Sequence, residues 1–222
     1  MAARVEETSE GRRSFLPAAG HDWLLPFYDP FVKLFGGDKA RRTLLDQATI
    51  RAGQRVLDVG CGTGTFAISI ERLHPNVEVV GLDPDPRALD RAERKARREA
   101  VSVRFDRGFS DRLPYPDASF DRVFSSFMFH HLSANEKEPT LCEIRRVLRP
   151  GGSFHLLDFG GSHEKRGLLT RFIHSSHRLA DNSEERILEL MARAGFAEAK
   201  TIGCRAFLFA RIAYYAAIAP PP

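Results

Sequence analysis

The chain has 222 residues, 43% of them hydrophobic and 28% charged, which favours a single domain and is typical of a soluble globular protein. No apolar run is long enough to cross a membrane, and the first fifteen residues lack the apolar stretch of a signal peptide. The three cysteines are odd in number and match no metal-ligand pattern, so we expect a reduced, cytoplasmic protein.

Apolar runs alternate with helical patterns after residue 50. The predicted strands are residues 55–60, 77–83, 101–106, 120–127 and 153–159, followed by closing strands at 199–204 and 206–218. The predicted helices are residues 65–73, a helix that starts after Asp85, and residues 134–148 and 186–195. Strands that alternate with helices imply a mainly parallel sheet with helices on both faces.

Capping residues mark where three of these helices begin. Asp85 precedes Pro86, and proline suits the first helical position because no amide donor is needed there. Ser133 can cap the helix that follows it, and Asp181 and Glu184 have capping-box spacing.

These elements predict an α/β protein with a doubly wound, mainly parallel seven-stranded sheet. Residues 1–50 lack strand character, and residues 21–35 and 39–48 are predicted helices that form a lid. We therefore divide the chain into a helical lid segment, residues 1–50, and a ligand-binding domain, residues 51–219. Sheets of this kind bind ligands beyond the carboxyl ends of their strands.

Residues 56–66, VLDVGCGTGTF, are an apolar run that ends in glycines at every second position. Dinucleotide-binding loops have the spacing G-x-G-x-x-G or G-x-G-x-x-A, and their last small residue allows close packing of helix and strand. Here that position is Thr65, which is β-branched, and Asp58 precedes the loop. A carboxylate there repels a pyrophosphate and suits a cationic ligand such as S-adenosylmethionine, which carries a sulfonium and an ammonium.

Four motifs in register resemble those of the class I S-adenosylmethionine-dependent methyltransferases. They are VLDVGCGTGTF, GLDPDPRALDRA, LPYPDASFDRVFSSFMFHHL and EIRRVLRPGGSFHLLDF, and they extend over about residues 50–160. The chain is most similar to the small-molecule branch that includes the ubiquinone/menaquinone C-methyltransferases. The resemblance implies a Rossmann-like methyltransferase fold with S-adenosyl-L-methionine as cofactor.

The resemblance also implies roles for individual positions. The matching cofactor-binding residues are Asp58, Gly60, Gly62, Thr63, Gly64, Asp83, Phe109, Ser110, Ser126 and Tyr28. The glycine loop would wrap the methionine part, with Ser126 near it, and Asp83 would accept hydrogen bonds from the ribose hydroxyls. Phe109 and Ser110 would hold the adenine, and Tyr28 would close over the cofactor from the lid. The alternatives are a turn aspartate for Asp83 and a core aromatic for Tyr28.

The chain departs from the family pattern at two places. Phe109 stands where an aspartate commonly accepts a hydrogen bond from the adenine amine. Its ring then lies against the purine, or Asp111 accepts from the amine, or Phe109 turns into the core and water meets the amine. His130 and His131 stand where the quinone enzymes carry Arg-Asn, which weakens the quinone assignment specifically.

Methyl transfer from a sulfonium is an in-line displacement, so holding the reactants in line is the main task. A base is needed only for a protonated nucleophile, and the candidates are His130 and His131. The alternatives are a structural role for both rings and a reaction without a base. Asp158, His21 and Tyr28 are further candidates expected at this sheet edge. His163, His174 and His177 are interpreted as loop histidines, and the pair His174 and His177 lacks a third metal ligand nearby.

Aromatic residues dominate the regions expected to shape the acceptor pocket, residues 15–35 and 159–180. They favour a small apolar or aromatic acceptor, such as a quinol, a phenol or a lipid-like molecule, although the same side chains could simply pack the lid on the sheet. The rival interpretations are an NAD-type oxidoreductase, a cofactor-binding protein without transfer activity, and an RNA methyltransferase. Only the basic stretch 87–100 supports the last, and its interleaved acids indicate a solvated helix face.

Overall fold

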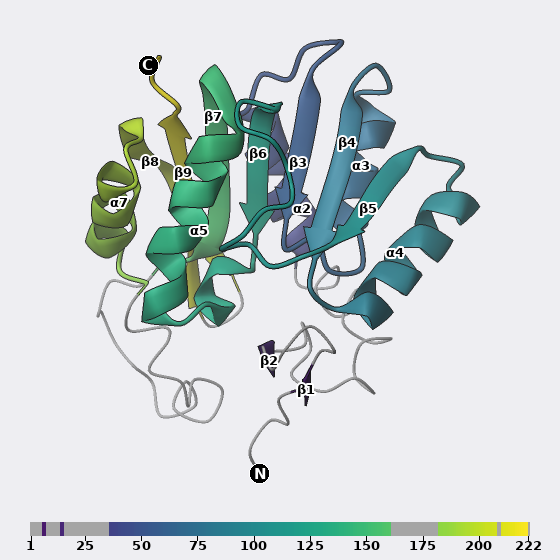
Figure 1. The fold of residues 1–222 in the computed structure, drawn as a ribbon, viewed down its shortest axis with the longest axis horizontal. Coiled ribbons are helices and arrows are strands. Elements are labelled where there is room, and N and C mark those ends of the chain that lie inside the picture. The colour runs from purple at the N-terminus through teal and green to yellow at the C-terminus, as the bar shows by residue number, and fades with distance from the viewer. Residues whose placement is uncertain (1–5, 8–13, 16–35, 161–181, 208–209, 222) are drawn as a thin grey trace.

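The computed structural model describes residues 6–7, 14–15, 36–160, 182–207 and 210–221 (Figure 1). Two short strands near the N-terminus, β1 (Glu6–Glu7) and β2 (Ser14–Phe15), pair antiparallel with each other. The predicted helix at residues 21–35 lies outside the described residues, so the lid and the two-part division of the chain stay predictions.

The centre of the molecule is a seven-stranded sheet in the order β5-β4-β3-β6-β7-β9-β8. Its strands are β3 (Arg55–Val59), β4 (Glu78–Asp83), β5 (Val103–Arg107), β6 (Phe120–Ser126), β7 (Leu148–Phe159), β8 (Ala197–Phe207) and β9 (Ala210–Ile218). The first five run parallel, whereas β9 pairs antiparallel with both β7 and β8. This confirms the predicted mainly parallel seven-stranded sheet, and the carboxyl ends of its parallel strands face the lower edge in Figure 1.

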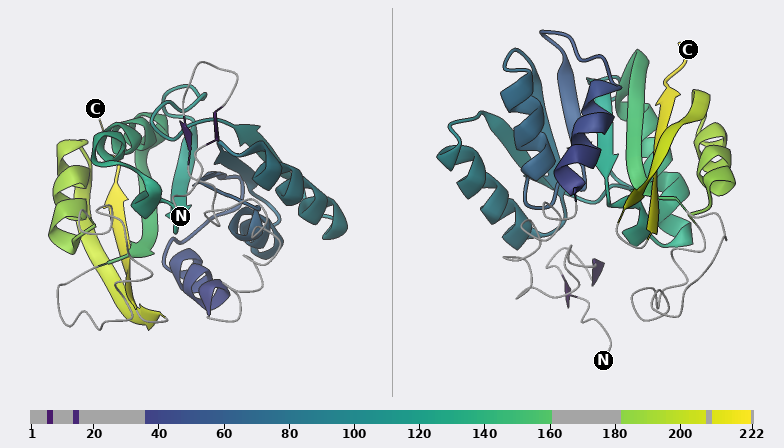
Figure 2. Two further views of the ribbon diagram at one scale, coloured as in Figure 1. Left: turned by 90° about the horizontal axis from the view of Figure 1, so that it is seen from below. Right: turned by 180° about the vertical axis from the view of Figure 1, so that it is seen from behind.

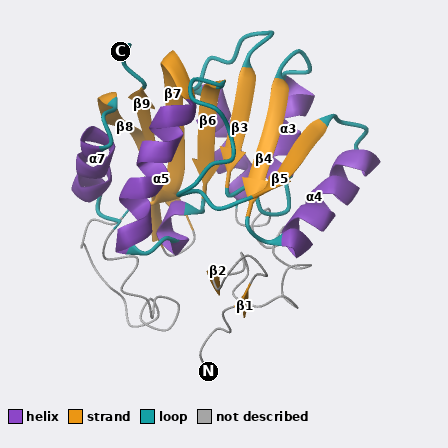
Figure 3. Ribbon diagram, in the orientation of Figure 1, coloured by secondary structure: helices purple, strands orange, loops and turns teal. Residues whose placement is uncertain are grey.

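Helices cover both faces of the sheet (Figure 3). They are α2 (Gly37–Asp46), α3 (Thr65–Leu73), α4 (Pro86–Arg98), α5 (Ala134–Val147) and α7 (Glu184–Arg193). Leu44 of α2 and Phe66 of α3 share one buried cluster, and Ile144 of α5 and Ile187 of α7 belong to the other. The view from behind in Figure 2 accordingly places α2 and α3 on the face opposite α5 and α7. The fold is doubly wound, as predicted.

Two of the three predicted caps are confirmed. The Asp85 side chain accepts from the amide of Arg87, and Ser133 forms a reciprocal capping box with Glu136. The third prediction is wrong, because the N-cap of α7 is Ser183, whose hydroxyl accepts from the amide of Arg186. Ser183 is the extended residue directly before the first helical turn, and Asp181 lies outside the described residues.

Strand β7 begins at Leu148, five residues before the predicted start at Ser153. The amide of Gly151 donates to the carbonyl of Ala219, so the chain beyond β9 adds ladder bonds that a local pattern does not reveal. None of the helices in the described residues is long and apolar enough to cross a membrane.

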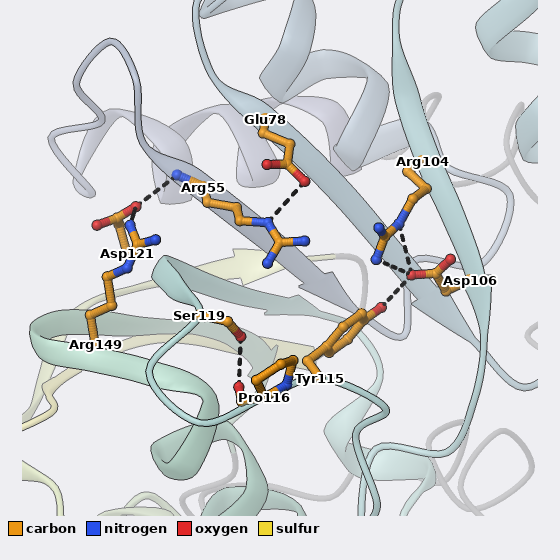
Figure 4. Close-up of polar contacts among 9 residues, drawn as sticks. All are labelled: Arg55, Glu78, Arg104, Asp106, Tyr115, Pro116, Ser119, Asp121 and Arg149. Atoms are coloured by element: carbon orange, nitrogen blue, oxygen red, sulfur yellow. Dashed lines mark hydrogen bonds and ion pairs between the residues drawn. The ribbon is translucent and has the colours of Figure 1, made fainter.

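Charged side chains pair with one another at the amino ends of the parallel strands (Figure 4). The Arg55 guanidinium donates to Glu78 at 2.8 Å, and Asp121 accepts from both the Arg55 amide at 2.8 Å and Arg149 at 2.6 Å. The carboxylates of Glu78 and Asp121, at this end of the sheet, therefore both have hydrogen-bond partners.

Candidate active site

The loop between β3 and α3 needs glycine for its backbone conformation. Gly60, Gly62 and Gly64 have φ angles of +74°, +53° and +75°, in the left-handed region that side chains rarely adopt. The amides of Gly60 and Cys61 both donate to the carbonyl of Leu82, at 2.8 and 3.0 Å. The loop is thereby held against the end of β4.

The three glycines face different surroundings. A Cβ at Gly60 would overlap the Met128 side chain, and one at Gly64 would lie 2.7 Å from the Ala92 Cβ and 2.9 Å from the Phe105 ring. A Cβ at Gly62 would meet nothing within 4 Å. Two glycines are thus required by packing within the protein, and Gly62 presents bare backbone where a ligand can approach.

Asp83 ends β4 beside this loop and is 9% exposed. Its carboxylate accepts the amide of Gly62 at 2.8 Å and the amide of Asp85 at 2.9 Å. Burial raises its pKa to about 6, although the two amide hydrogen bonds lower it. A carboxylate has about four acceptor sites, so this one can hold the loop and still accept two hydroxyl groups.

Asp58 lies in β3 and is 1% exposed. Neither of its carboxylate oxygens has a hydrogen-bond partner. Burial raises its pKa to about 7, Arg41 lowers it, the neighbouring charge of Asp83 raises it, and the Ala67 amide, which lies nearby without good hydrogen-bond geometry, lowers it. A buried carboxylate without partners is costly to the folded protein, which indicates a site for a cationic ligand group.

Arg41 is a residue of this site that sequence reasoning missed. It lies on α2, is 9% exposed, and donates from Nε to the Ser126 hydroxyl at 3.3 Å. Its guanidinium carbon lies 5.6 Å from the centre of the Phe127 ring. The available signal was the helical spacing of Arg41 with Ala40, Leu44 and Leu45, which places the arginine on the buried side of the helix.

Phe127 follows β6 with a φ of +56°, an uncommon conformation for a residue with a side chain. Its amide donates to the carbonyl of Leu157 at 2.8 Å, and its ring packs against Phe159 and Phe207. The turn it makes sends Met128 over Gly60 and leads into a short 3-10 helix, η2 (Phe129–His131). Backbone strain of this kind concentrates at functional sites.

His130 is bound to Asp158 of the neighbouring strand, β7. The distance from His130 Nδ1 to Asp158 Oδ1 is 2.7 Å, and the His130 amide donates to the other carboxylate oxygen at 3.0 Å. Asp158 is fully buried, and the His130 side chain is 16% exposed. The carboxylate orients the ring with Nδ1 as donor, which leaves Nε2 as the acceptor. The His131 ring lies 4.1 Å from the His130 ring.

The predicted adenine-binding residues follow β5, next to Asp83. The Gly108 amide donates to the Asp83 carbonyl at 3.2 Å, which holds Phe109 and Ser110 close to that strand end. Both side chains are half-buried, and the Ser110 hydroxyl is 2.9 Å from the Thr140 hydroxyl of α5. In the glycine loop, the Thr63 hydroxyl accepts from Lys95 at 3.3 Å.

The structure thus gathers most of the predicted site residues at one sheet edge. Tyr28, His21, His163, His174 and His177 lie outside the described residues, and their roles stay predictions. The arrangement offers a bare glycine backbone, the buried carboxylates of Asp58 and Asp83, a buried guanidinium and an imidazole oriented by the buried Asp158. It can hold a ligand that carries both charges and hydroxyl groups, and it can accept a proton beside that ligand.

Comparison with known proteins identifies relatives of this chain. A family model described as a methyltransferase domain matches residues 56–152. The demethylmenaquinone methyltransferase of Deinococcus radiodurans is 42% identical over 139 residues, which are 61% of this chain and 57% of that protein. The enzyme of the same name from Thermus thermophilus is 40% identical over 139 residues, 61% of this chain and 62% of that protein. The chain therefore matches less than two thirds of the length of these two relatives.

A solved structure shares the fold. The phosphoethanolamine N-methyltransferase 2 of Haemonchus contortus, crystallised with S-adenosylhomocysteine, superposes with a TM-score of 0.71 at 18% identity. The superposition covers 82% of this chain and 53% of that one.

Proposed function

We propose that this chain is a class I S-adenosylmethionine-dependent methyltransferase, which the matching methyltransferase domain and the similar curated proteins support, and that it transfers a methyl group from S-adenosyl-L-methionine to a small apolar or aromatic acceptor. The observation that carries the proposal is Asp58, a carboxylate that is 1% exposed and has no hydrogen-bond partner. It lies beside a glycine loop whose middle glycine faces open space. A cationic, phosphate-free cofactor fits this combination, and a pyrophosphate does not.

The residues present suit the parts of this cofactor. When bound, S-adenosylmethionine supplies an electrophilic methyl group on a sulfonium, which leaves as a neutral thioether. Asp83 would accept the two ribose hydroxyls, and Asp58 would face the ammonium. Phe109 and Ser110 would border the adenine, since Gly108 ties their turn to Asp83.

His130 is the proposed general base, oriented by Asp158. An imidazole whose Nδ1 donates to a carboxylate presents Nε2 as the proton acceptor, and such catalysis contributes about 10²–10⁴-fold to a rate. Asp158 fixes the orientation of the ring, because its oxygens accept from the His130 ring and amide and from the amide of Phe159. Met128 directly precedes the η2 turn that carries His130, and its side chain lies against Gly60 of the cofactor loop.

An acceptor with an ionisable hydroxyl on an aromatic ring fits this base. Removing the proton from a phenol or hydroquinone makes either its oxygen or its ring carbon a better nucleophile. Aromatic side chains near His130 support an apolar acceptor, since the Phe159 ring centre lies 4.9 Å from the His130 ring and also packs on Phe127. The two relatives named as demethylmenaquinone methyltransferases support an aromatic quinol in particular.

Two measurements test the proposal. Calorimetric titration with S-adenosylhomocysteine and with NAD checks the cofactor, and we expect the first ligand alone to bind. A methyl-donor assay against quinols, phenols, amines and lipids, read by mass spectrometry, checks transfer. Cofactor binding without turnover on any member of the panel would favour a binding protein, and NAD binding alone would overturn the cofactor assignment.

A further inference from the structure

We propose that the outer face of α4 binds the surface of an anionic phospholipid bilayer through an arginine stripe, Arg87, Arg91, Arg94 and Arg98. The inference rests on the proposed function in one respect: an apolar acceptor partitions into a bilayer, and an enzyme that acts on it must meet it there. None of the four side chains is assigned to the cofactor or to the base.

The spacing of the four arginines places them on one side of α4. Steps of four, three and four residues follow the period of an α-helix, so the side chains form a line along it. Arg87, Arg94 and Arg98 are exposed, and Arg91 is half-buried. The buried residues of the helix lie on the opposite side and are Ala88, Leu89, Ala92 and Ala96.

The acids that interleave with these arginines in the sequence lie beside the stripe. Glu93 pairs with Arg97 at 3.3 Å, and Glu99 accepts from Arg72 of α3 at 3.0 Å. Asp90 flanks the stripe and forms no ion pair with a described residue. The arginines of the stripe that likewise form no ion pair with any described residue are Arg91, Arg94 and Arg98. The stripe therefore keeps an excess of positive charge.

The stripe begins near the candidate active site. α4 lies at the outer edge of the molecule beside the edge strand β5, and it starts after the turn that follows Asp83 (Figure 1). Arg107, exposed at the end of β5, donates from Nε to the carbonyl of Pro84 at 3.3 Å and places a further guanidinium beside the start of the helix. A bilayer bound along the stripe would therefore adjoin the sheet edge that holds the site.

The chemistry of the stripe fits lipid phosphates. Guanidinium groups form bidentate hydrogen bonds with phosphate, and each basic residue near an anionic bilayer adds about fivefold in affinity. Recognition of single-stranded RNA also uses aromatic side chains on which bases stack, and α4 has none. Phe105, the aromatic residue of β5, packs inward against Gly64. These features favour a bilayer over RNA.

Vesicle binding by matched variants tests the inference. Co-sedimentation is measured with vesicles of phosphatidylcholine and with vesicles of phosphatidylcholine and phosphatidylglycerol in roughly equal parts. The stripe variant combines three substitutions: Arg91→Gln, Arg94→Gln and Arg98→Gln. The control variant combines three substitutions of exposed arginines on α2 and α7: Arg42→Gln, Arg186→Gln and Arg193→Gln. Both variants lower the formal net charge by three, from +4 to +1, so they differ in where the charge is removed.

The unmodified protein should bind the anionic vesicles and not the neutral ones, and raised salt should release it because ions screen the attraction. The stripe variant should bind the anionic vesicles about 100-fold more weakly, as expected for the loss of three basic residues at the surface. The control variant should stay within about threefold of the unmodified protein, because its charges lie away from the bilayer.

No binding of the unmodified protein to anionic vesicles, or an equal loss of binding in the two variants, would overturn the inference. Tighter binding to a single-stranded RNA oligonucleotide than to anionic vesicles would overturn it as well and would assign the surface to nucleic acid. Vesicle binding requires no methyl transfer. Failure of the unmodified protein to methylate any acceptor would therefore contradict the proposed function and leave the bilayer contact standing.

Discussion

Asp58 distinguishes the two ends of the parallel strands, because Asp83 and Asp158 at the carboxyl ends accept hydrogen bonds, as the carboxylates at the amino ends do. At the amino ends, Asp121 accepts from Arg55 and Arg149, and Glu78 accepts from Arg55. At the carboxyl ends, Asp58 has no hydrogen-bond partner, and burial raises its pKa to about 7. The carboxylates at the amino ends are paired within the protein, whereas Asp58 is the group that the proposed cofactor would pair with.

The difference in pairing affects both the stability of the folded protein and its affinity for a ligand. A pair of opposite charges near the surface typically stabilises the folded protein by only about 0–1 kcal/mol. A buried, unpaired carboxylate destabilises the ligand-free protein, and a bound cation can return that free energy as affinity. Changes at the carboxyl ends should therefore have large effects on function, and changes at the amino ends should have small ones.

The largest expected effect is on turnover. His130→Ala should lower kcat by about two to four orders of magnitude with cofactor affinity retained, because the general base is lost. His131→Ala is the neighbouring control and should keep most of the activity, since the carboxylate of Asp158 binds His130. Near-normal rates in both variants would mean that positioning alone carries the reaction.

Asp58→Asn should change the dependence of stability on pH. A folded-state pKa of about 7, above the ordinary value of 3.8, means that Asp58 favours folding at low pH and that this contribution is lost as pH rises through about 7. The loss is on the order of 4 kcal/mol from about pH 4 to pH 8, at 1.36 kcal/mol per pKa unit.

Denaturant unfolding of the ligand-free protein at several pH values checks this. The free energy of unfolding of Asp58→Asn, relative to the unmodified protein, should increase with pH. If the difference in free energy of unfolding between the two proteins stayed constant from pH 5 to pH 8, burial would not raise the pKa of Asp58. The same variant should bind S-adenosylhomocysteine more weakly. Its stability at high pH should therefore rise while its affinity for the ligand falls.

Asp83→Ala should weaken cofactor binding by roughly 1.5–3 kcal/mol, the range for hydrogen bonds to a charged group. The variant also loses the acceptor for the Gly62 amide, so the loop itself is loosened. Comparing adenosine with its 2′,3′-dideoxy analogue separates the two effects. If Asp83 accepts the ribose hydroxyls, removing them should cost affinity in the unmodified protein and not in Asp83→Ala.

Phe109 and Asp111 offer two ways to hold the adenine. Ring contact from Phe109 would be worth about 1–3 kcal/mol, so Phe109→Ala should lose that affinity for S-adenosylhomocysteine and Asp111→Asn should not. Titration of both variants decides between them. Unchanged dissociation constants in both would mean that neither side chain contacts the adenine.

Glu78→Gln, at the amino ends, should have the smallest effect. It weakens the pair with Arg55, in which the glutamate side chain is 57% exposed, and should cost less than about 1 kcal/mol of stability. Cofactor affinity should not change. A loss of binding comparable to that of Asp83→Ala would remove the contrast between the two ends of the sheet.

Much of the fold was predictable because its signals are local. Asp85 before Pro86 and Ser133 with Glu136 specify helix starts within a few residues, and α3 begins and ends where the pattern predicted. The cap of α7 was mispredicted because Ser183 competes with Asp181 over the same few residues, and burial and backbone geometry decide between them.

The sequence by itself determined the alternation of strands and helices, the glycine loop and the acids before it, since each depends on neighbours in the chain. The tertiary structure decided which of these residues meet. His130 and Asp158 are 28 positions apart, and Arg41 and Ser126 are 85 apart, so each contact depends on which strands pair and which helix face is buried. The open space at Gly62 and the missing partners of Asp58 follow from packing around them, which no local pattern specifies.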